Sequence, residues 1–550
     1  MNNKTLNLLL SLIFFLLISC SSDHSTNDNR IVIGISSDVQ SFNSLFAFSY
    51  EETVIADLLY PGLSDFQWNA DRGELEDHPM LAKCWQWSVD SSSIKFILRD
   101  DVKWSDGKKL TSEDIVFSYD IYSDPNVQSR LMGTFDQFFL EDNGHIDVLQ
   151  SFKIISEYEL EFLFPVGSNP DLFEIIVPII PKHIFENIGR DEIGTHESSF
   201  NPVSCGAFKL KDWERNQTIK LEADSNSFLF QQGQISELVF KIIPDYTSRI
   251  LQLKKGNIDL AEQIKVEDIP GLSVLENLSV KNIVGREYDY IGWNNIDVNQ
   301  FEKGMLKPNK LFGSRNIRKA LSMAVNRKEI LDEYLLGQGI LTATPVSPIF
   351  KSSFNEDVKP YDYSPEEAKR LLAAEGWKDE NKNGILEKGN TEFKFTLYYP
   401  VGNPLREYAA VIIKNNLKAV GVELTTEKME LGAFIDNLYE KKLDAWMAGF
   451  GVPIPLDLKP YWYSDPNTGF LNFSSYKNDE VDNILDQLEA DITDEIKKEK
   501  IQKFQEIIHY DEPVTFLYWT PNIIVYNKKI TNLKITPYGV LVHCWEWKIN

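Results

Sequence analysis

Short alternating strands and amphipathic helices follow one another along the whole chain. Apolar and polar residues alternate at 94–98 and 393–399, which predicts strands, and the apolar run 31–35 predicts a buried strand. Residues 405–420 carry apolar side chains at helical spacing, and Gly421 ends that run. The pattern has no fixed repeat, so it predicts a mixed α/β chain without a solenoid or a coiled coil.

Helix starts are marked by capping residues. Thr111 and Asp114 have the spacing of a helix N-cap, and the segment 364–367 (SPEE) is a capping box with proline at the first helical position. Asn326 and Glu329 repeat the same device. We therefore expect helices to begin at 112, 365 and 327.

The first thirty residues have a different character. Lys4 precedes the apolar stretch 8–18, which at about 1.5 Å per residue is too short to cross a ~30 Å hydrocarbon core. Ser19 and Cys20 follow, so residues 1–19 are predicted to be a secretory signal peptide. The segment LISC at 17–20 resembles the bacterial lipobox, which implies that Cys20 is lipidated. Residues 20–29 are polar and predicted to be a flexible tether.

Composition and charge limit the classes of partner and ligand that the protein is expected to bind. The chain has 550 residues, of which 43% are hydrophobic and 12% aromatic, enough for about three or four domains' worth of fold. Its formal charge of −26 argues against nucleic acid, because binding to phosphates needs an excess of Lys and Arg. A cationic or zwitterionic ligand is compatible with this charge.

The cysteines leave two interpretations open. Besides Cys20 the chain has Cys84, Cys205 and Cys544, which allow at most one disulfide and leave one thiol over. Export permits such a bridge. Three buried, reduced cysteines are the alternative, since a free cysteine packs as a small hydrophobic residue.

Catalytic motifs are missing from the sequence. It contains no G-x-S-x-G elbow, no Walker loop and no H-x-x-x-H or H-E-x-x-H zinc spacing. Ser-x-x-Lys occurs three times, at 92–95, 105–108 and 474–477. A pattern of only two residues that recurs three times in one chain is background and does not indicate a catalytic site. We therefore expect that the protein is not an enzyme.

One segment resembles the first part of a calcium-binding loop. Asp379, Asn381, Asn383, Ile385 and Glu387 occupy positions 1, 3, 5, 7 and 9 of such a loop, with glycine at position 6. Position 12 is asparagine, where calcium loops have a bidentate glutamate. Asn, Asp and Gly also build ordinary turns, so a plain turn and a weak Ca²⁺ site are both open. No other cofactor is expected.

Four segments, in order, resemble the family 5 extracellular solute-binding proteins of bacterial ABC importers, which include oligopeptide, dipeptide and nickel binders. The most specific is 81–119, which matches a Trp before a turn, an F-x-L-R strand, a V-K-W-x-D-G turn and a T-x-x-D helix start. The others are 202–208 (PVSCGAF), 317–327 (IRKALSMAVNR) and 444–461 (DAWMAGFGVPIPLDLKPY).

The resemblance implies a two-lobed, periplasmic-binding-protein-like α/β fold with a ligand cleft. It assigns 30–60, 197–290 and 511–550 to lobe I, 61–196 to a subdomain inserted in lobe I, and 291–510 to lobe II. The hinge between the lobes is expected near 288–294 and near 511–513.

The resemblance also implies a function. The protein is expected to be a monomeric, lipid-anchored substrate-binding component of an ABC importer, on the periplasmic face or the cell surface of a bacterial envelope. It would capture peptides and deliver them to a membrane permease. A non-peptide solute, such as an oligosaccharide or a nickel complex, is the alternative within the same fold, and an envelope enzyme or a structural lipoprotein is a further one.

The family's ligand contacts map onto two places in this chain. Backbone groups of Cys205 and Gly206 would contact the ligand from lobe I, and Gly449, Phe450 and Gly451 from lobe II. Phe450 stands where the family usually has Trp, and a core aromatic is the alternative interpretation of it.

The acidic anchor of peptide binders departs from the family pattern. Peptide binders place an aspartate shortly after the aromatic residue to pair with the peptide's ammonium group. An alignment without a gap puts Pro453 at that position. An alignment from the other end makes Asp457 the anchor, after a longer loop, and an Asp457 that simply faces solvent is the alternative.

Overall fold

One sheet of eleven strands extends through the whole molecule. The structure, a computed structural model, describes residues 29–168, 170–301, 303, 305–490 and 492–550. The strand order is β17-β16-β18-β12-β19-β11-β1-β10-β9-β8, with β13 paired to β19. The strands are β1 (Arg30–Ile35), β8 (Phe208–Glu214), β9 (Thr218–Ala223), β10 (Glu237–Ile242), β11 (Leu260–Ala261), β12 (Leu278–Trp293), β13 (Ile340–Leu341), β16 (Lys394–Pro400), β17 (Glu423–Met429), β18 (Ala445–Gly451) and β19 (Val514–Asn527).

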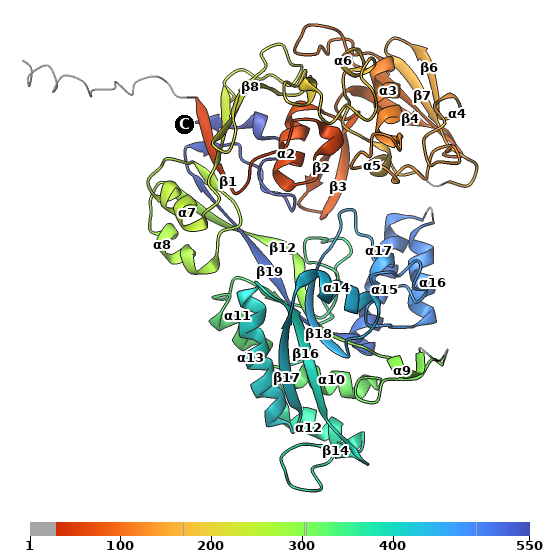
Figure 1. Ribbon diagram of the computed structural model, residues 1–550, viewed down its shortest axis with the longest axis vertical. Coiled ribbons are helices and arrows are strands. Elements are labelled where there is room, and N and C mark those ends of the chain that lie inside the picture. Colours follow the sequence, from red (N-terminus) through yellow and green to blue (C-terminus); the bar gives the residue numbers. More distant parts are fainter. Residues whose placement is uncertain (1–28, 169, 302, 304, 491) are drawn as a thin grey trace, which may run out of the picture.

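The two longest strands, β12 and β19, connect an upper and a lower half of the molecule (Figure 1). They pair antiparallel from Leu278↔Asn527 to Gly292↔Val514. We call residues 29–284 and 521–550 the upper half, and residues 285–520 the lower half. In the lower half, β18 pairs with the C-terminal part of β12 and so connects β16 and β17 to the sheet. In the upper half, β11 pairs with the C-terminal part of β19 and so connects β1, β10, β9 and β8.

A bulge interrupts the pairing of β12 with β19 at the boundary between the halves. The register shifts between Val284↔Pro521 and Tyr288↔Trp519, so residues 285–287 face only Thr520. A Cβ on Gly285 would lie 2.0 Å from the Thr520 carbonyl oxygen, which explains why glycine stands there. This irregularity lies just before the expected hinge segment 288–294 on β12.

On β19 the bulge lies at Thr520, seven residues beyond the expected hinge segment 511–513. That segment forms the turn between α17 (Asp494–Asp511) and β19. Glu512 is buried there in a left-handed conformation (φ 46°), and Arg318 donates to the carbonyl oxygens of Glu512 (2.7 Å) and Asp511 (2.8 Å). These bonds fix the turn inside the lower half.

The upper half contains a second, four-stranded sheet in the order β4-β5-β7-β6 and a separate β2–β3 hairpin. These elements lie within residues 61–196, where the sequence predicts the inserted subdomain. The strands are β2 (Ser64–Asn69), β3 (Glu74–Pro79), β4 (Ala82–Trp87), β5 (Ser93–Leu98), β6 (Phe152–Ser156) and β7 (Glu159–Leu163). The helices of the upper half are α2 (Tyr50–Leu59), α3 (Ser112–Ser123), α4 (Val148–Ser151), α5 (Leu172–Ile175), α6 (Lys182–Phe185), α7 (Tyr246–Lys254) and α8 (Ile269–Ser273).

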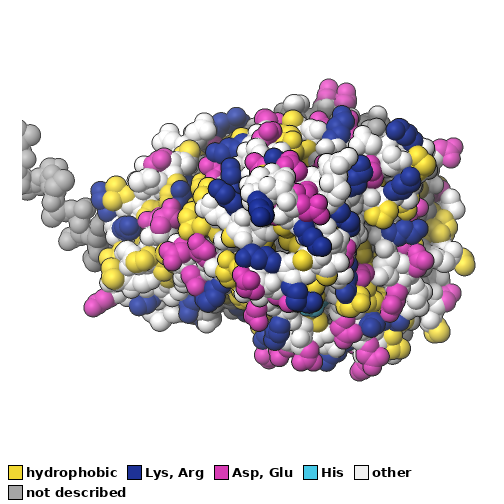
Figure 2. Space-filling model, turned by 90° about the horizontal axis from the view of Figure 1, so that it is seen from below, with side chains coloured by type: hydrophobic (Ala, Val, Ile, Leu, Met, Phe, Trp, Pro, Cys, Tyr) yellow, Lys and Arg dark blue, Asp and Glu magenta, His cyan; other side chains and the backbone are white. Residues whose placement is uncertain are grey.

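Helices cover the sheet in the lower half (Figure 1). They are α9 (Val298–Phe301), α10 (Arg315–Ala324), α11 (Arg327–Glu333), α12 (Pro365–Ala374), α13 (Pro404–Ala419), α14 (Leu431–Tyr439), α15 (Lys459–Trp462), α16 (Asp479–Leu488) and α17. Two short hairpins complete the chain, one of β14 (Glu387–Lys388) and β15 (Thr391–Glu392), the other of β20 (Ile530–Thr531) and β21 (Lys548–Ile549). Viewed from below, the lower half carries side chains of both charge signs, interspersed with hydrophobic ones (Figure 2).

Three hydrophobic clusters form the core. The first holds the upper sheet and the inserted sheet together. The second joins α7 and α8 to the helices α10–α13 of the lower half through β12 and β19. The third lies around α14–α17, and Trp68 and Leu75 of the β2–β3 hairpin pack against it. The third cluster therefore brings side chains of both halves into contact.

Most of the predicted elements are confirmed. The three predicted strands are β1, β5 and β16, and the predicted helix at 405–420 is α13. Thr111 N–H donates to the Asp114 carboxylate (2.9 Å), and the Asn326 side chain accepts from Glu329 N–H (3.3 Å), as their spacing predicts. At α12 the capping box is wrong in detail, because the side chain of Ser364 makes no capping hydrogen bond.

The signal peptide and Cys20 lie outside the described residues. Within the part of the chain that the structure describes, no helix is both long and apolar enough to cross a bilayer. Cys84, Cys205 and Cys544 are all free thiols. Cys205 and Cys544 are buried, whereas Cys84 is exposed on β4, so the expectation of burial is wrong for Cys84.

Candidate ligand-binding site beside the strand crossing

A pocket lies in the lower half next to the bulge of β12. It brings together β12, the end of β18, the loop that follows β18, the short helix α15 and the start of a loop at 345. Its lining residues are Tyr288, Pro345, Phe450, Gly451, Val452, Pro453, Asp457, Leu458, Tyr461 and Trp462. Phe450, Gly451 and Asp457, three of the residues expected to contact the ligand, are therefore neighbours in one pocket.

Aromatic rings form one wall of this pocket. Phe450 stacks on Tyr290, with ring centroids 5.2 Å apart and planes 14° apart, and meets Tyr461 edge-on at 4.9 Å. Phe450 is half-buried, because its far side also faces Phe473 at 6.1 Å. The residue thus contributes to the packing of the third cluster and also lines the pocket.

Asp457 is an exposed carboxylate at the rim of the pocket. Its Oδ1 accepts from the backbone N–H of Lys459 (3.0 Å), which starts α15. The Lys459 ammonium pairs with Asp486 (2.9 Å) and Glu489 (2.6 Å), and no Lys or Arg in the described ranges forms an ion pair with Asp457. Desolvation by nearby protein atoms raises the pKa of Asp457, and the Lys459 N–H opposes that shift. The carboxylate keeps acceptor capacity for a cationic ligand group.

A second acidic group approaches from the upper half. Glu174 lies on α5 and accepts a hydrogen bond from the Gln137 side chain. Desolvation raises the pKa of Glu174, and the charges of Asp171, Asp136 and Asp457 raise it further. Asp457 and Glu174 therefore belong to one region of negative potential between the halves. The sequence analysis does not identify Glu174 as a site residue. Its negative charge is the only sequence feature that relates it to the site, and many other residues share that charge.

Trp462 lines the pocket with a side chain that is almost fully buried. Its side chain is 4% exposed, and its indole N–H has no hydrogen-bond partner among the described residues. Buried indole N–H groups usually have a partner. The indole N–H groups of Trp104, Trp377, Trp519 and Trp547 also lack a partner in the described chain, so this feature alone does not indicate a ligand. In the sequence Trp462 directly follows the family segment 444–461, and nothing in the pattern distinguished it from a core residue.

Gly449 lies beside a buried ion pair and is not among the residues that line the pocket. Arg406 at the start of α13 donates to the Asp289 carboxylate at 2.6 and 3.2 Å. A Cβ on Gly449 would lie 2.5 Å from Asp289 Oδ1 and 2.6 Å from Arg406 Nη2. Glycine is therefore needed at 449 so that this pair can form. Gly451 lines the pocket, and its carbonyl accepts a long bond from Tyr461 Oη (3.4 Å).

Cys205 and Gly206 lie in the upper half against the end of α2. Both of their N–H groups donate to the Leu59 carbonyl oxygen, at 3.1 and 2.9 Å. A Cβ on Gly206 would lie 2.2 Å from the Leu58 carbonyl oxygen, and burial raises the pKa of the Cys205 thiol well above its ordinary value. Their amides thus stabilise the upper half, and a ligand could use only other backbone groups of this turn.

The calcium-like loop lies at the far end of the lower half. Asp379 accepts from the N–H groups of Asn383 and Gly384 (both 3.0 Å), and Asn383 Oδ1 accepts from Ile385 N–H (2.8 Å). Asn381 Oδ1 also accepts from Asn383 N–H (2.9 Å). No cluster of three or more His, Cys, Asp or Glu residues suited to a metal occurs in the described chain. A cation in this loop would need amide and backbone oxygens besides its carboxylates.

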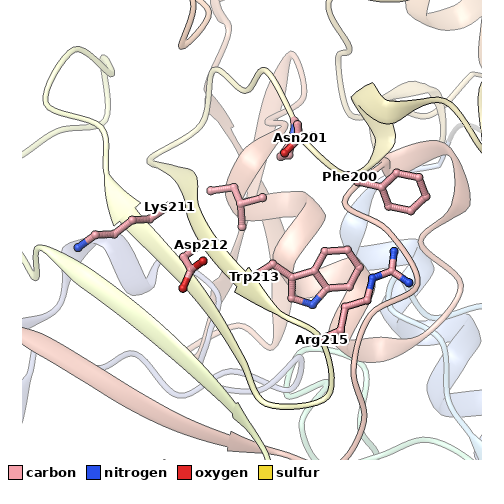
Figure 3. Close-up of a pocket in the computed structure, with 8 residues that line it drawn as sticks. Phe200, Asn201, Lys211, Asp212, Trp213 and Arg215 are labelled. Carbon is pink, nitrogen blue, oxygen red and sulfur yellow. The ribbon is translucent and has the colours of Figure 1, made fainter.

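A larger pocket lies on the outer edge of the upper half, along the edge strand β8 (Figure 3). Arg215 extends over the ring of Trp213, with its guanidinium carbon 4.4 Å from the ring centroid, and Trp213 Nε1 donates to Asp38 (3.0 Å). None of the residues expected to contact the ligand lines this pocket.

Comparison with known proteins gives consistent results. Residues 76–472 match the family model of the middle region of the bacterial extracellular solute-binding proteins, family 5. The chain is 28% identical to the oligopeptide-binding protein AppA of Bacillus subtilis, over 99% of this chain and 98% of that protein. It is 25% identical to the nickel-binding periplasmic protein of Escherichia coli, over 80% and 77% of the two chains.

A solved structure shares the fold. The structure of B. subtilis AppA in complex with a nonapeptide superposes with a TM-score of 0.68 at 27% identity, covering 95% of this chain and 99% of that one.

Proposed function

The chain belongs to family 5 of the bacterial extracellular solute-binding proteins, and from this premise we propose that it captures peptides between its two lobes for an ABC importer. We propose that lobe I with its inserted subdomain is the upper half and lobe II the lower half, apart from 285–290 and 511–520, which the resemblance assigns to lobe I. The observation that carries the choice of peptides is the Asp457 carboxylate, which has no ion-pair partner in the described chain and lies in a pocket walled by Phe450 and Tyr461.

The chemistry of the pocket matches the start of a peptide. Asp457 can accept hydrogen bonds from an α-ammonium group. The aromatic wall offers apolar contact for a side chain. Glu174 adds negative potential from the other half, which favours a cationic group over an anionic one. Relatives of this chain are named for oligopeptides and, in one case, for nickel.

Capture requires no chemical step. A ligand that contacts both lobes favours the closed arrangement by its differential contacts, and a permease can recognise that arrangement. The pocket residues supply charge, hydrogen-bond donors and apolar surface. We therefore propose binding without catalysis.

The proposed location rests on the sequence of residues 1–20. We propose that Cys20 is lipidated and anchors a monomer on the periplasmic face or the surface of the bacterial envelope, close to its permease. Two or more acyl chains are needed for stable anchoring, which a lipidated N-terminal cysteine can carry. The Cys20→Ala variant is expected to leave the membrane fraction in detergent-free buffer. Continued sedimentation of this variant with membranes would contradict the anchor.

The ligand class is best tested without assuming a sequence. The purified mature protein is incubated with a mixed peptide library, dialysed and examined by native mass spectrometry. Intact co-purifying peptides are the expected result. Retention of a sugar or a metal complex would instead identify a non-peptide solute, and shortened peptides in the supernatant would indicate an enzyme.

A further inference from the structure

Glu387 carries a buried carboxylate oxygen with no partner. The residue is 9% exposed, and its Oε2 makes no hydrogen bond within the described chain. Its Oε1 accepts from the N–H groups of Glu380 (2.9 Å) and Asn381 (3.0 Å). The carboxylate is therefore held against the start of the loop 379–387. A buried anionic oxygen without a donor is costly, so it requires an explanation.

The backbone keeps this side chain in place. Glu387 N–H donates to the Lys378 carbonyl oxygen (2.8 Å), and Lys378 N–H donates to the Glu387 carbonyl oxygen (3.0 Å). These two bonds pair the residue with the chain that enters the loop, one residue before Asp379. No ion pair of Glu387 with a Lys or Arg occurs in the described chain, so no protein cation satisfies the carboxylate.

The other loop positions supply oxygen atoms. Asp379, Asn381 and Asn383 each have a side-chain oxygen turned toward the loop's own amides, and Gly384 adopts the left-handed conformation (φ 87°) that a sharp loop needs at this position. Oxygen atoms from carboxylates, side-chain amides and backbone carbonyls are the ligands that Ca²⁺ takes, at six to eight per ion.

We propose that the loop 379–387 binds one Ca²⁺ ion, with the free oxygen of Glu387 as the fifth protein ligand beside Asp379, Asn381, Asn383 and the Ile385 carbonyl, and water in the remaining positions. Only two of these groups are charged, and position 12 of the loop is Asn390. Affinity is therefore expected in the range of about 10⁻⁴ to 10⁻³ M that suits extracellular calcium modules. The site lies apart from the ligand pocket and does not depend on the proposed function.

The experiment compares two single-charge variants of the same loop. Glu387→Gln keeps an oxygen for the N–H groups of Glu380 and Asn381 but replaces the free oxygen with an NH₂ group. Glu380→Gln removes a neighbouring exposed charge that is not a proposed ligand. Each protein is stripped with EDTA and titrated with CaCl₂ alone to about 10 mM, by calorimetry and by thermal unfolding.

Wild type and Glu380→Gln are expected to bind Ca²⁺ and to melt at a higher temperature with it, because the ion binds only the folded loop. Glu387→Gln is expected to lose affinity by at least about tenfold. Absence of binding to wild type, or equal binding by Glu387→Gln, would overturn the site. If Glu387→Gln melts like wild type in EDTA, its loss of binding cannot be attributed to misfolding.

Discussion

At the scale of single residues, the proposed choice of peptides as ligands rests on Asp457, which lines the pocket. An exposed ion pair contributes about 0–1 kcal/mol, whereas removing one partner of a desolvated pair costs about 2–5 kcal/mol. The surroundings of Asp457 already raise its pKa by desolvation, and a ligand that covers the pocket would desolvate it further. An ammonium group should therefore gain much more at this carboxylate than it would at the protein surface.

Asp457→Asn is expected to weaken binding of a free-amine peptide by at least about 30-fold, because it removes the charge but can still accept from Lys459 N–H. The loss should disappear for the same peptide with an acetylated N-terminus. Calorimetry measures both affinities. Asp465→Asn is the matched control, since Asp465 Oδ1 accepts from Asn467 N–H (2.8 Å) in a similar turn of the same half. Equal affinity of Asp457→Asn and wild type for the free-amine peptide would make Asp457 a surface residue.

Glu512 is expected to make stability depend on pH. Burial raises its pKa from 4.5 to about 7, although hydrogen bonding to Ser322 and the charges of Arg327 and Arg318 oppose the shift. The folded protein therefore keeps a proton that the unfolded chain loses above pH 4.5. The stability from this group is complete below pH 4.5 and is lost as the pH rises through about 7.

The corresponding loss between pH 4.5 and pH 8 is about 3 kcal/mol, which Glu512→Gln should remove. Chemical unfolding at pH 5 and pH 8 measures the difference for both proteins. Glu506→Gln, an exposed change on α17, the helix that precedes Glu512, is expected to retain the wild-type pH dependence. A pH dependence of Glu512→Gln as steep as that of wild type would contradict a raised pKa for this group.

Some site residues could be identified from the sequence and others could not. Phe450, Gly451 and Asp457 lie in one continuous segment, so the resemblance to the family was sufficient to group them. Pro345 and Glu174 come from loops and helices more than a hundred residues away, and no local pattern marks them. Cys205 and Gly206 show the opposite case, because their amides are satisfied by Leu59 in a contact that no local pattern specifies.

At the scale of elements, the bulge between β12 and β19 separates the two halves. Gly285 allows the backbone to approach the Thr520 carbonyl, and two strands that start 236 residues apart in sequence shift register at this point. Ser347 Oγ also donates to the Gly285 carbonyl oxygen (3.3 Å), so the loop after β13 touches the bulge. The bulge is thus fixed by contacts on two sides.

Gly285→Ala is expected to lower the free energy of unfolding by about 1–3 kcal/mol, because the added methyl group overlaps a backbone carbonyl that cannot rotate away. Equilibrium unfolding in urea measures this change. Gly271→Ala is the control, since a Cβ there would meet only the Lys254 ammonium nitrogen at 3.6 Å. Its helical position makes it neutral or slightly stabilising. Equal stability of both variants would show that the bulge can relax.

Periodic elements were predictable from sequence and the bulge was not, for a physical reason. α13 and β16 are set by side-chain periodicity within one segment, which a local pattern records. The register of β12 on β19 depends on which residues of these two distant segments pair with each other. The periodicity within one segment contains no information about that pairing. The hinge expected at 511–513 stays a prediction, and no local pattern shows that Arg318, almost two hundred residues away, holds that turn.

At the scale of the whole molecule, the β2–β3 hairpin makes a contact between the halves at a distance from the strand crossing. The tip of the β2–β3 hairpin meets the loop 349–353 of the lower half. Ser352 N–H donates to the Arg72 carbonyl oxygen (2.8 Å), its hydroxyl donates to Glu74, and Trp68 meets Phe350 edge-on at 6.2 Å. The β2–β3 hairpin lies on the side of the upper half that faces the lower half (Figure 1).

This contact lies on the same side as the pocket. The segment 345–352 links the two places. Pro345 lines the pocket, Ser347 contacts the bulge, and Ser352 contacts the β2–β3 hairpin. Contacts that exist only when the lobes are together stabilise the closed arrangement and so raise the affinity for any ligand that requires it. The hairpin is therefore expected to influence affinity without touching the ligand.

Gly73 offers a direct test, since a Cβ there would lie 2.0 Å from the Ile349 carbonyl oxygen and 2.9 Å from Phe350 Cα. Its φ of +73° is tolerated by asparagine, so Gly73→Asn should keep the hairpin turn while forcing the halves apart. Gly144→Asn is the matched control, with a φ of +84° and no atom within 4 Å.

Gly73→Asn is expected to weaken binding of every ligand by at least about tenfold and to enlarge the ligand-free molecule in small-angle scattering, whereas Gly144→Asn should match wild type in both. The scattering comparison needs no ligand, so it remains decisive even if peptides are not the substrate. A Gly73→Asn protein with wild-type dimensions would mean that the hairpin moves together with the lower half. In that case the bulge at Gly285 alone would separate the moving bodies, and the inserted subdomain would have to rotate relative to the sheet of the upper half.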